Sequence, residues 1–248
     1  MRHTPFLRAV LMGMIGLLAS LSPMAFAQPL TPYEQTQVFA FRATSSLLLL
    51  RGEGLQDGHR KRLEGDMVDL DKAFTSIASP SAELRTTYQA LVTQLRNGAT
   101  YGPKEEDMPF RFPQDLSKSL RDFMLVAYSE GAPSAKDELP AKIEYLAVQY
   151  LYRAYMGSFE TAREHPDQYL GQDERVLLPS IDKQLTDLNA KSNPEIAKLK
   201  PRWEYLKSAL GDMNSQSNTL ASASGRAFAP ITVDRHTRAF STQWMALK

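Results

Sequence analysis

The chain of 248 residues contains no cysteine. Disulfide bonds, thiol nucleophiles, iron–sulfur clusters and haem attached through a Cys-x-x-Cys-His motif are therefore excluded. A cysteine-free protein has to be held together by its hydrophobic core. A chain of this length can build such a core, either as one domain or as two.

Histidine is scarce as well, and only His59, His165 and His236 follow the first 27 residues. No two of them stand three or four residues apart, so neither a zinc site nor a di-iron site is predicted. Residues 52–58 hold three glycines but lack the strand and the spacing of a nucleotide-binding loop, and we interpret them as a turn between helices. No Gly-x-Ser-x-Gly segment occurs either. Without a recognisable nucleophile and base, we expect neither an enzyme nor a cofactor.

Long apolar runs are absent except near the start of the chain. Arg2 and Arg8 precede an apolar run at residues 9–21, and residues 25–27 read Ala-Phe-Ala. This order is typical of a signal peptide, residues 1–27, which is cleaved after Ala27. The alternative is an uncleaved anchor, but 13 apolar residues fall short of the roughly 20 that span a bilayer. We therefore expect a periplasmic protein that begins at Gln28 and is not inserted in the membrane.

An excess of charge of one sign is also absent. Removal of the predicted signal peptide leaves 27 basic and 28 acidic side chains. Nucleic acid binding favours a concentrated basic surface, so we expect no nucleic acid partner. The candidate partners are a small anion, another envelope protein and a second copy of the chain.

The chain does contain a series of helical patterns. Thr31-Pro32-Tyr33-Glu34 combines an N-cap, a proline at the first helical position and a capping box. No segment alternates polar and apolar residues as a half-buried strand would, so the predicted fold class is all-α. Helices are expected at residues 32–50, 59–78, from 82 to Asn97-Gly98, 113–130, from Ala141 to His165, from Pro194 with a kink at Pro201, and around Val233, Phe240 and Trp244, with a weakly helical segment at 214–229.

The helix expected at 59–78 has two distinct faces. Leu63, Leu70 and neighbouring apolar residues form a heptad stripe that is typical of a bundle seam. Asp66, Asp69 and Asp71 are interpreted as solvent-exposed residues of the polar face rather than as an acid–base pair. The basic residues 59–62 at its start either remain solvated or bind an anion at the helix N-terminus.

The two halves of the chain resemble each other at nearly constant spacing. An offset of 111 pairs Phe39 with Tyr150 and Leu70 with Ile181, and offsets of 115 and 117 continue the match toward the C-terminus. A period this long does not fit a solenoid repeat. It indicates two tandem copies of a roughly four-helix unit, at residues 28–131 and 141–248, which are joined by a linker at 132–140.

Arg42 and Arg153 occupy equivalent positions in the two predicted copies, at offset 111. An arginine flanked by core positions either extends out of the bundle, forms a salt bridge, or lines a groove where it binds an anion. We therefore take Arg42 and Arg153 as the candidate ligand-binding residues.

Residues 41–46 read Phe-Arg-Ala-Thr-Ser-Ser, and Leu199 to Leu210 form an apolar stripe that includes Trp203. These segments resemble the periplasmic helical-bundle sensor domain of nitrate/nitrite sensor kinases and of type IV pilus chemoreceptors, whose first helix carries Arg-Met-Leu-Ser-Gln. The resemblance implies a helical bundle that recognises a small anion through Arg42, and it adds Ser45 to the candidate site. The second copy keeps only Arg153 of this motif.

Two functions remain open from the sequence. The first is a soluble periplasmic binding or accessory protein that is similar to a sensor domain and recognises a small anion. The second is a structural or protein-interaction component of the cell envelope without a small-molecule ligand. They differ in what the surface exposes, since a large exposed apolar patch favours the second.

Overall fold

The computed structural model describes residues 30–131, 138–157, 159–188, 194–213 and 228–247. Within these ranges all regular structure is helical, which confirms the all-α fold class. The predicted signal peptide lies outside the described residues, as does most of the predicted linker. The helices are α2 (Pro32–Gly52), α3 (Asp57–Thr75), α4 (Ala82–Thr100), α5 (Phe112–Gly131), α6 (Leu139–Tyr155), α7 (Glu174–Asp187), α8 (Pro194–Gly211) and α9 (Pro230–Met245), with short 3-10 turns at Glu105–Asp107 and Tyr169–Gly171.

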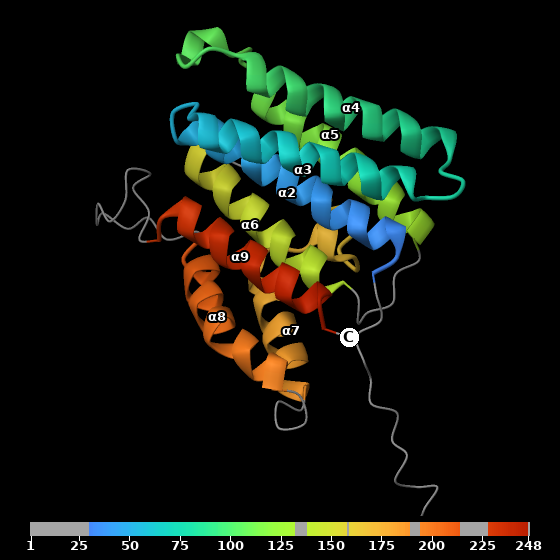
Figure 1. Ribbon diagram of the computed structural model, residues 1–248, viewed down its shortest axis with the longest axis vertical. Coiled ribbons are helices and arrows are strands. Elements are labelled where there is room, and N and C mark those ends of the chain that lie inside the picture. Colours follow the sequence, from blue (N-terminus) through green and yellow to red (C-terminus); the bar gives the residue numbers. More distant parts are fainter. Residues whose placement is uncertain (1–29, 132–137, 158, 189–193, 214–227, 248) are drawn as a thin grey trace, which may run out of the picture.

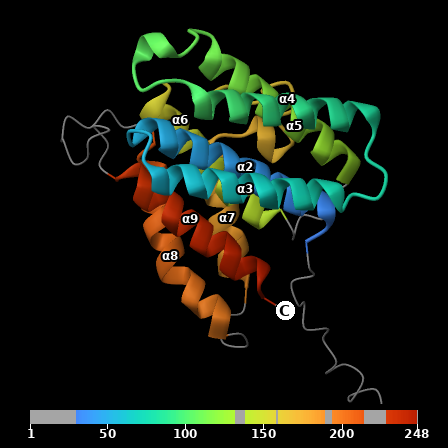
Figure 2. The ribbon, with the colours of Figure 1, turned by 45° about the horizontal axis from the view of Figure 1, so that its top comes forward.

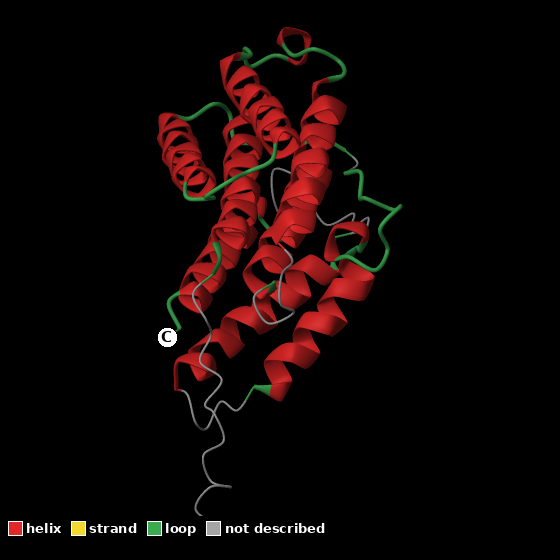
Figure 3. Cartoon of the chain, turned by 90° about the vertical axis from the view of Figure 1, so that its right-hand side faces the viewer, coloured by secondary structure: helices red, strands yellow, loops and turns green. Residues whose placement is uncertain are grey.

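The helices follow one another across the molecule in successive pairs (Figure 1). The α4–α5 pair lies at one end, α2 and α3 come next, then α6 and α9, and the α7–α8 pair lies at the other end. A second view again places the α4–α5 pair and α8 at opposite ends (Figure 2), and a third shows that the described segments are helices joined by loops (Figure 3). Helix α2 packs against α6, so the predicted units meet along their first helices.

Helices α2 and α6 are buried on nearly every side. The four consecutive leucines at 47–50 in α2 are all fully buried, which requires neighbours all round the helix because successive residues point in different directions. In α6 almost every residue from Leu139 to Tyr152 is buried. The buried apolar residues of both halves form one continuous core.

The duplication stays a prediction, although α2–α5 and α6–α9 place four helices in each half in the predicted order. The seam residues Leu70 and Ile181 are both fully buried, as expected. The capping box at Thr31 and Glu34 is also confirmed, because each residue's side chain accepts a hydrogen bond from the backbone N–H of the other.

Two predicted helix ends are wrong. Helix α4 continues past Asn97-Gly98 to Thr100. Gly98 does not end the helix but allows it to pack closely on α5, since a Cβ atom at this position would lie 2.5 Å from the ring of Phe112. Helix α6 ends at Tyr155, about ten residues before the predicted His165, and Gly157 follows in the left-handed region at φ +95°. Of the segment predicted to be weakly helical, residues 214–227 lie outside the described part of the chain.

Candidate functional site

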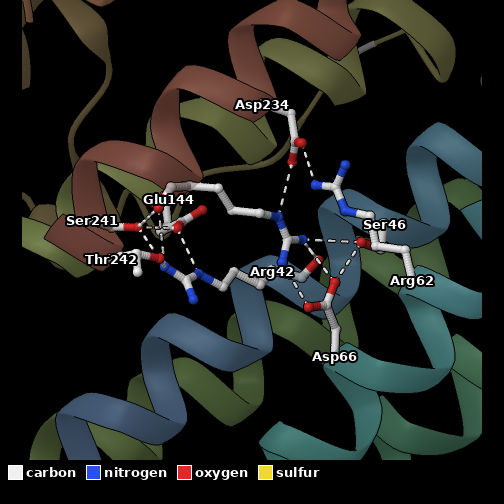
Figure 4. Close-up of polar contacts among 9 residues, drawn as sticks. Arg42, Ser46, Arg62, Asp66, Glu144, Asp234, Ser241 and Thr242 are labelled. Carbon is white, nitrogen blue, oxygen red and sulfur yellow. Dashed lines mark hydrogen bonds and ion pairs between the residues drawn. The ribbon is translucent and has the colours of Figure 1, made fainter. Parts of the chain in front are cut away.

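Arg42 enters the interior of the molecule from α2 (Figure 4). Its side chain is 8% exposed, and its Nε donates a hydrogen bond to Oε1 of Glu144 on α6 at 2.8 Å. Its Nη2 donates to the hydroxyls of Ser241 and Thr242 on α9, at 2.7 and 2.8 Å. Ser241 also donates to the same oxygen of Glu144. Arg42 thus joins three helices through charge-assisted hydrogen bonds.

A second arginine makes the complementary connection from α9 to α3. Nη1 and Nη2 of Arg238 donate to the two carboxylate oxygens of Asp66, at 2.6 and 2.7 Å. Nη2 also donates to the backbone oxygen of Arg42 at 2.9 Å and to Oγ of Ser46 at 3.0 Å. Burial alone lowers the pKa of Arg238, but the Asp66 hydrogen bonds and the charges of Asp234, Asp66 and Glu144 outweigh burial and raise it. The guanidinium therefore remains charged.

The third connection is the ion pair between Arg62 of α3 and Asp234 of α9. All three connections join the first half of the chain to the second, and the set is neutral because three arginines face three carboxylates. Burial of charge is costly unless each charge is paired and hydrogen-bonded. We call this group the clasp; it consists of Arg42, Ser46, Arg62, Asp66, Glu144, Asp234, Arg238, Ser241 and Thr242.

Helical spacing brings the clasp residues onto the correct faces. Arg42 and Ser46 are four residues apart in α2, and Arg62 and Asp66 are four apart in α3. Residues at this spacing share one helix face. Positions 234, 238 and 241 repeat the pattern in α9. The sequence thus contains a signal for the clasp, namely polar pairs at i,i+4 beside apolar stripes, but it does not say which helices meet.

The clasp corrects our interpretation of the acidic residues in α3. Asp71 is exposed as expected and the side chain of Asp69 is about half exposed, whereas Asp66 is buried and ion-paired with Arg238. Asp66 lies three residues after Leu63 and four before Leu70, so it borders the buried stripe rather than the opposite face. Glu144 and Asp234, whose burial the sequence pattern did not indicate, are buried in the same way.

The three predicted ligand-binding residues lie in different surroundings. Arg42 belongs to the clasp. Ser45 is fully buried, and its hydroxyl oxygen has no hydrogen-bond partner in the described part of the chain. Arg153 on α6 has a side chain that is 20% exposed, and it lies 3.7 Å from a carboxylate oxygen of Glu174 on α7. The salt-bridged alternative therefore describes both Arg42 and Arg153, and ligand binding by the three residues stays a prediction.

Arg60 at the start of α3 and Arg51 at the end of α2 also stabilise the fold. Arg60 donates to the backbone oxygen of Ala99 at 3.0 Å, while Arg51 donates to the backbone oxygens of Tyr101 and Gly102, both at 2.9 Å. Carbonyl groups at a helix C-terminus lack partners within the helix, and cations there also favour the helix dipole. Arg51 and Arg60 thus cap the C-terminus of α4.

A small cavity of about 10 Å³ lies beside Phe41, between α5, α6 and residues 159–170, and it has room for about one water molecule. The described ranges contain no cluster of three or more His, Asp or Glu residues that could bind a metal ion. They also contain no helix with the length and apolar character needed to cross a bilayer.

Comparisons with protein-family models, curated proteins and solved structures found no match to this chain. The resemblance to sensor domains therefore stays a prediction.

Proposed function

We propose that this protein is an exported accessory protein of the periplasm that acts by binding another envelope protein, and that its Arg42 holds the two halves together instead of binding a small ligand. One observation carries the proposal: the buried Arg42 guanidinium is already bound by Glu144, Ser241 and Thr242.

The energetics of Arg42 support a structural role. An anion that took the place of Glu144 at Nε of Arg42 would leave this fully buried carboxylate without its cation. Leaving one partner of a buried ion pair uncompensated costs about 3–5 kcal/mol. A new charge-assisted hydrogen bond returns only about 1.5–3 kcal/mol. Exchange of Glu144 for a small anion is therefore unfavourable unless the ligand makes substantial further contacts.

The outer surface offers an apolar contact point for a protein partner. Phe110, in the segment between α4 and α5, is 90% exposed, which makes it the most exposed large apolar side chain among the described residues. Burial of such a side chain contributes about 1.5–3 kcal/mol. Aromatic residues are also enriched at the energetic centres of protein interfaces.

Photo-crosslinking in the periplasm tests the protein-binding proposal. A benzoylphenylalanine at position 110 replaces one aromatic side chain with another, and the same group at the exposed position Thr86 of α4 is the control. We expect a discrete cross-linked protein from position 110 only. The same products from both positions, or none from position 110, would contradict the proposal.

A thermal-shift screen with small anions, amino acids and peptidoglycan fragments tests the other function. A ligand that binds only the folded protein raises its Tm. We expect no such ligand to depend on Arg153, so Arg153→Gln and wild type should respond alike. An anion whose effect is lost in Arg153→Gln and retained in Arg85→Gln, at an exposed arginine of α4, would favour anion binding at Arg42, Ser45 and Arg153.

Export is testable separately. We expect the periplasmic form to begin at Gln28, and intact-mass measurement of the purified protein decides this. A mass that retains residues 1–27 would identify a membrane-anchored protein instead.

A further inference from the structure

A basic cluster lies where α8 and α9 pack against each other. The two helices run antiparallel, because Trp203 lies against Phe240 while Tyr205 lies against His236. The rings of Tyr205 and His236 are 4.3 Å apart between centroids, at an angle of 34°. Arg202 precedes Tyr205 by about one helical turn, and Arg235 is adjacent to His236. We call Arg202, Tyr205, Arg235 and His236 the α8–α9 basic cluster.

The cations of this cluster lack carboxylate partners. Among the described residues neither Arg202 nor Arg235 forms an ion pair, whereas Arg42, Arg62 and Arg238 do. The connection between the two helices at residues 214–227 cannot supply one, because it contains no Asp or Glu. The cluster therefore carries at least two positive charges that no neighbouring residue is shown to neutralise.

Two buried nitrogen atoms in the cluster also lack hydrogen-bond partners. Nε of Arg202 and Nδ1 of His236 are both inaccessible to solvent and have no partner within the described residues. Unsatisfied buried polar atoms are uncommon and need an explanation, such as a bound ion or water. Burial and then the positive charges of Arg202 and Arg235 lower the pKa of His236.

We propose that the α8–α9 basic cluster binds a phosphate-type oxyanion. Arg202 and Arg235 supply charge-assisted hydrogen bonds, and His236 adds another when it is protonated. A phosphate monoester carries a charge of about −1.5 to −2 at pH 7, which matches two arginines better than the single charge of a carboxylate does. The source of the oxyanion is either free phosphate or the phosphomonoester of a lipid headgroup. This inference goes beyond the proposed function and does not depend on it.

The cluster belongs to the second half only. At an offset of 115 Arg202 corresponds to Thr87, and at an offset of 117 Arg235 corresponds to Lys118. Lys118 is already ion-paired with Asp122 in its own helix. In the predicted duplication the first half therefore lacks the equivalent arginines.

Isothermal titration of the exported protein with inorganic phosphate tests the site, with sodium chloride at equal ionic strength as the reference. We expect binding to the wild type, and binding weakened roughly 10- to 150-fold in Arg202→Gln and in Arg235→Gln, the factor that a charge-assisted hydrogen bond contributes. Arg235 is exposed, so its variant folds even if the partly buried Arg202 proves sensitive. Arg85→Gln, at an exposed arginine of α4, makes the same charge change elsewhere and should bind like the wild type.

Vesicles of phosphatidylcholine with and without phosphatidic acid distinguish the two sources. Binding of free phosphate that depends on both cluster arginines supports a soluble oxyanion. Binding only to vesicles with phosphatidic acid, with the same dependence, supports a headgroup. Absence of binding in both experiments, or equal loss in Arg85→Gln, overturns the proposal. None of these outcomes tests Phe110 or Arg42, so failure here leaves the proposed function standing.

Discussion

At the scale of single residues, Arg42 is the one buried arginine among the described residues. Replacement by Met removes the guanidinium but keeps an unbranched side chain, and it leaves the fully buried Glu144 without its cation. We expect Arg42→Met to lower the free energy of unfolding by about 3–5 kcal/mol. Urea denaturation measures it. The control Arg153→Met removes a partly exposed arginine and should cost less.

The double variant Arg42→Met/Glu144→Met separates the loss of the pair from the cost of the remaining charge. Replacing a whole buried ion pair with apolar side chains is often neutral or stabilising. We therefore expect the double variant to regain most of the stability that Arg42→Met loses. If the double variant lost as much stability as Arg42→Met and Glu144→Met together, the ion pair would not be the source of the effect.

The lowered pKa of His236 makes the stability of the protein depend on pH. Burial, Arg202 and Arg235 lower its pKa in the folded protein below the ordinary value of 6.5. The unfolded chain therefore takes up the proton first, so this contribution to stability is complete above about pH 6.5 and is lost as pH falls through the lowered pKa. We expect the Tm of wild type to fall more steeply below this pH than that of His236→Asn. Parallel curves would contradict the assignment, and added phosphate should reduce the difference.

At the scale of elements, glycine has opposite effects on stability in helices α3 and α4. Gly98 faces Phe112 and Leu47 so closely that a Cβ atom would come within 3 Å of each, whereas Gly65 of α3 has open space around it. Alanine is favoured over glycine in a helix by about 0.5–1 kcal/mol. We expect Gly65→Ala to stabilise the protein by about this amount and Gly98→Ala to destabilise it by about 1–3 kcal/mol through overpacking.

Thermal or urea denaturation of the two glycine variants decides this prediction. Stabilisation by Gly98→Ala would show that α4 can move away from Phe112 at little cost. The close packing of α4 on α5 would then not be needed for stability.

At the scale of the whole molecule, the two halves share their core. Helix α2 is enclosed by helices of both halves, including α6, and the clasp spans the same boundary. We therefore expect one cooperative unfolding transition by calorimetry, with equal calorimetric and van't Hoff enthalpies. The isolated fragment 28–131 would expose the face of α2 that α6 covers and should self-associate or bind apolar dyes. Two separate transitions, or a fragment that melts cooperatively as a monomer, would contradict a shared core.

Local patterns were sufficient for much of the fold. The helix start at Thr31 follows from hydrogen bonds within four residues of chain, and the burial of Leu70 and Ile181 follows from apolar spacing along one helix. Gly157, in contrast, was a local signal for the end of α6. The His165-Pro166 pair, which also looks like a helix end, led us to place the end of this helix too late. The sequence by itself therefore determined the helical class, most helix positions and the apolar seams.

Only the tertiary structure decided which charges meet. Arg42 pairs with a residue 102 positions away, and Asp66 with one 172 positions away. Some polar residues beside an apolar seam face solvent, and others face a neighbouring helix. The residues nearby in the sequence do not distinguish the two cases. That difference depends on where α6 and α9 lie against α2 and α3, because a buried charge is stable only where its partner has been brought within hydrogen-bond distance.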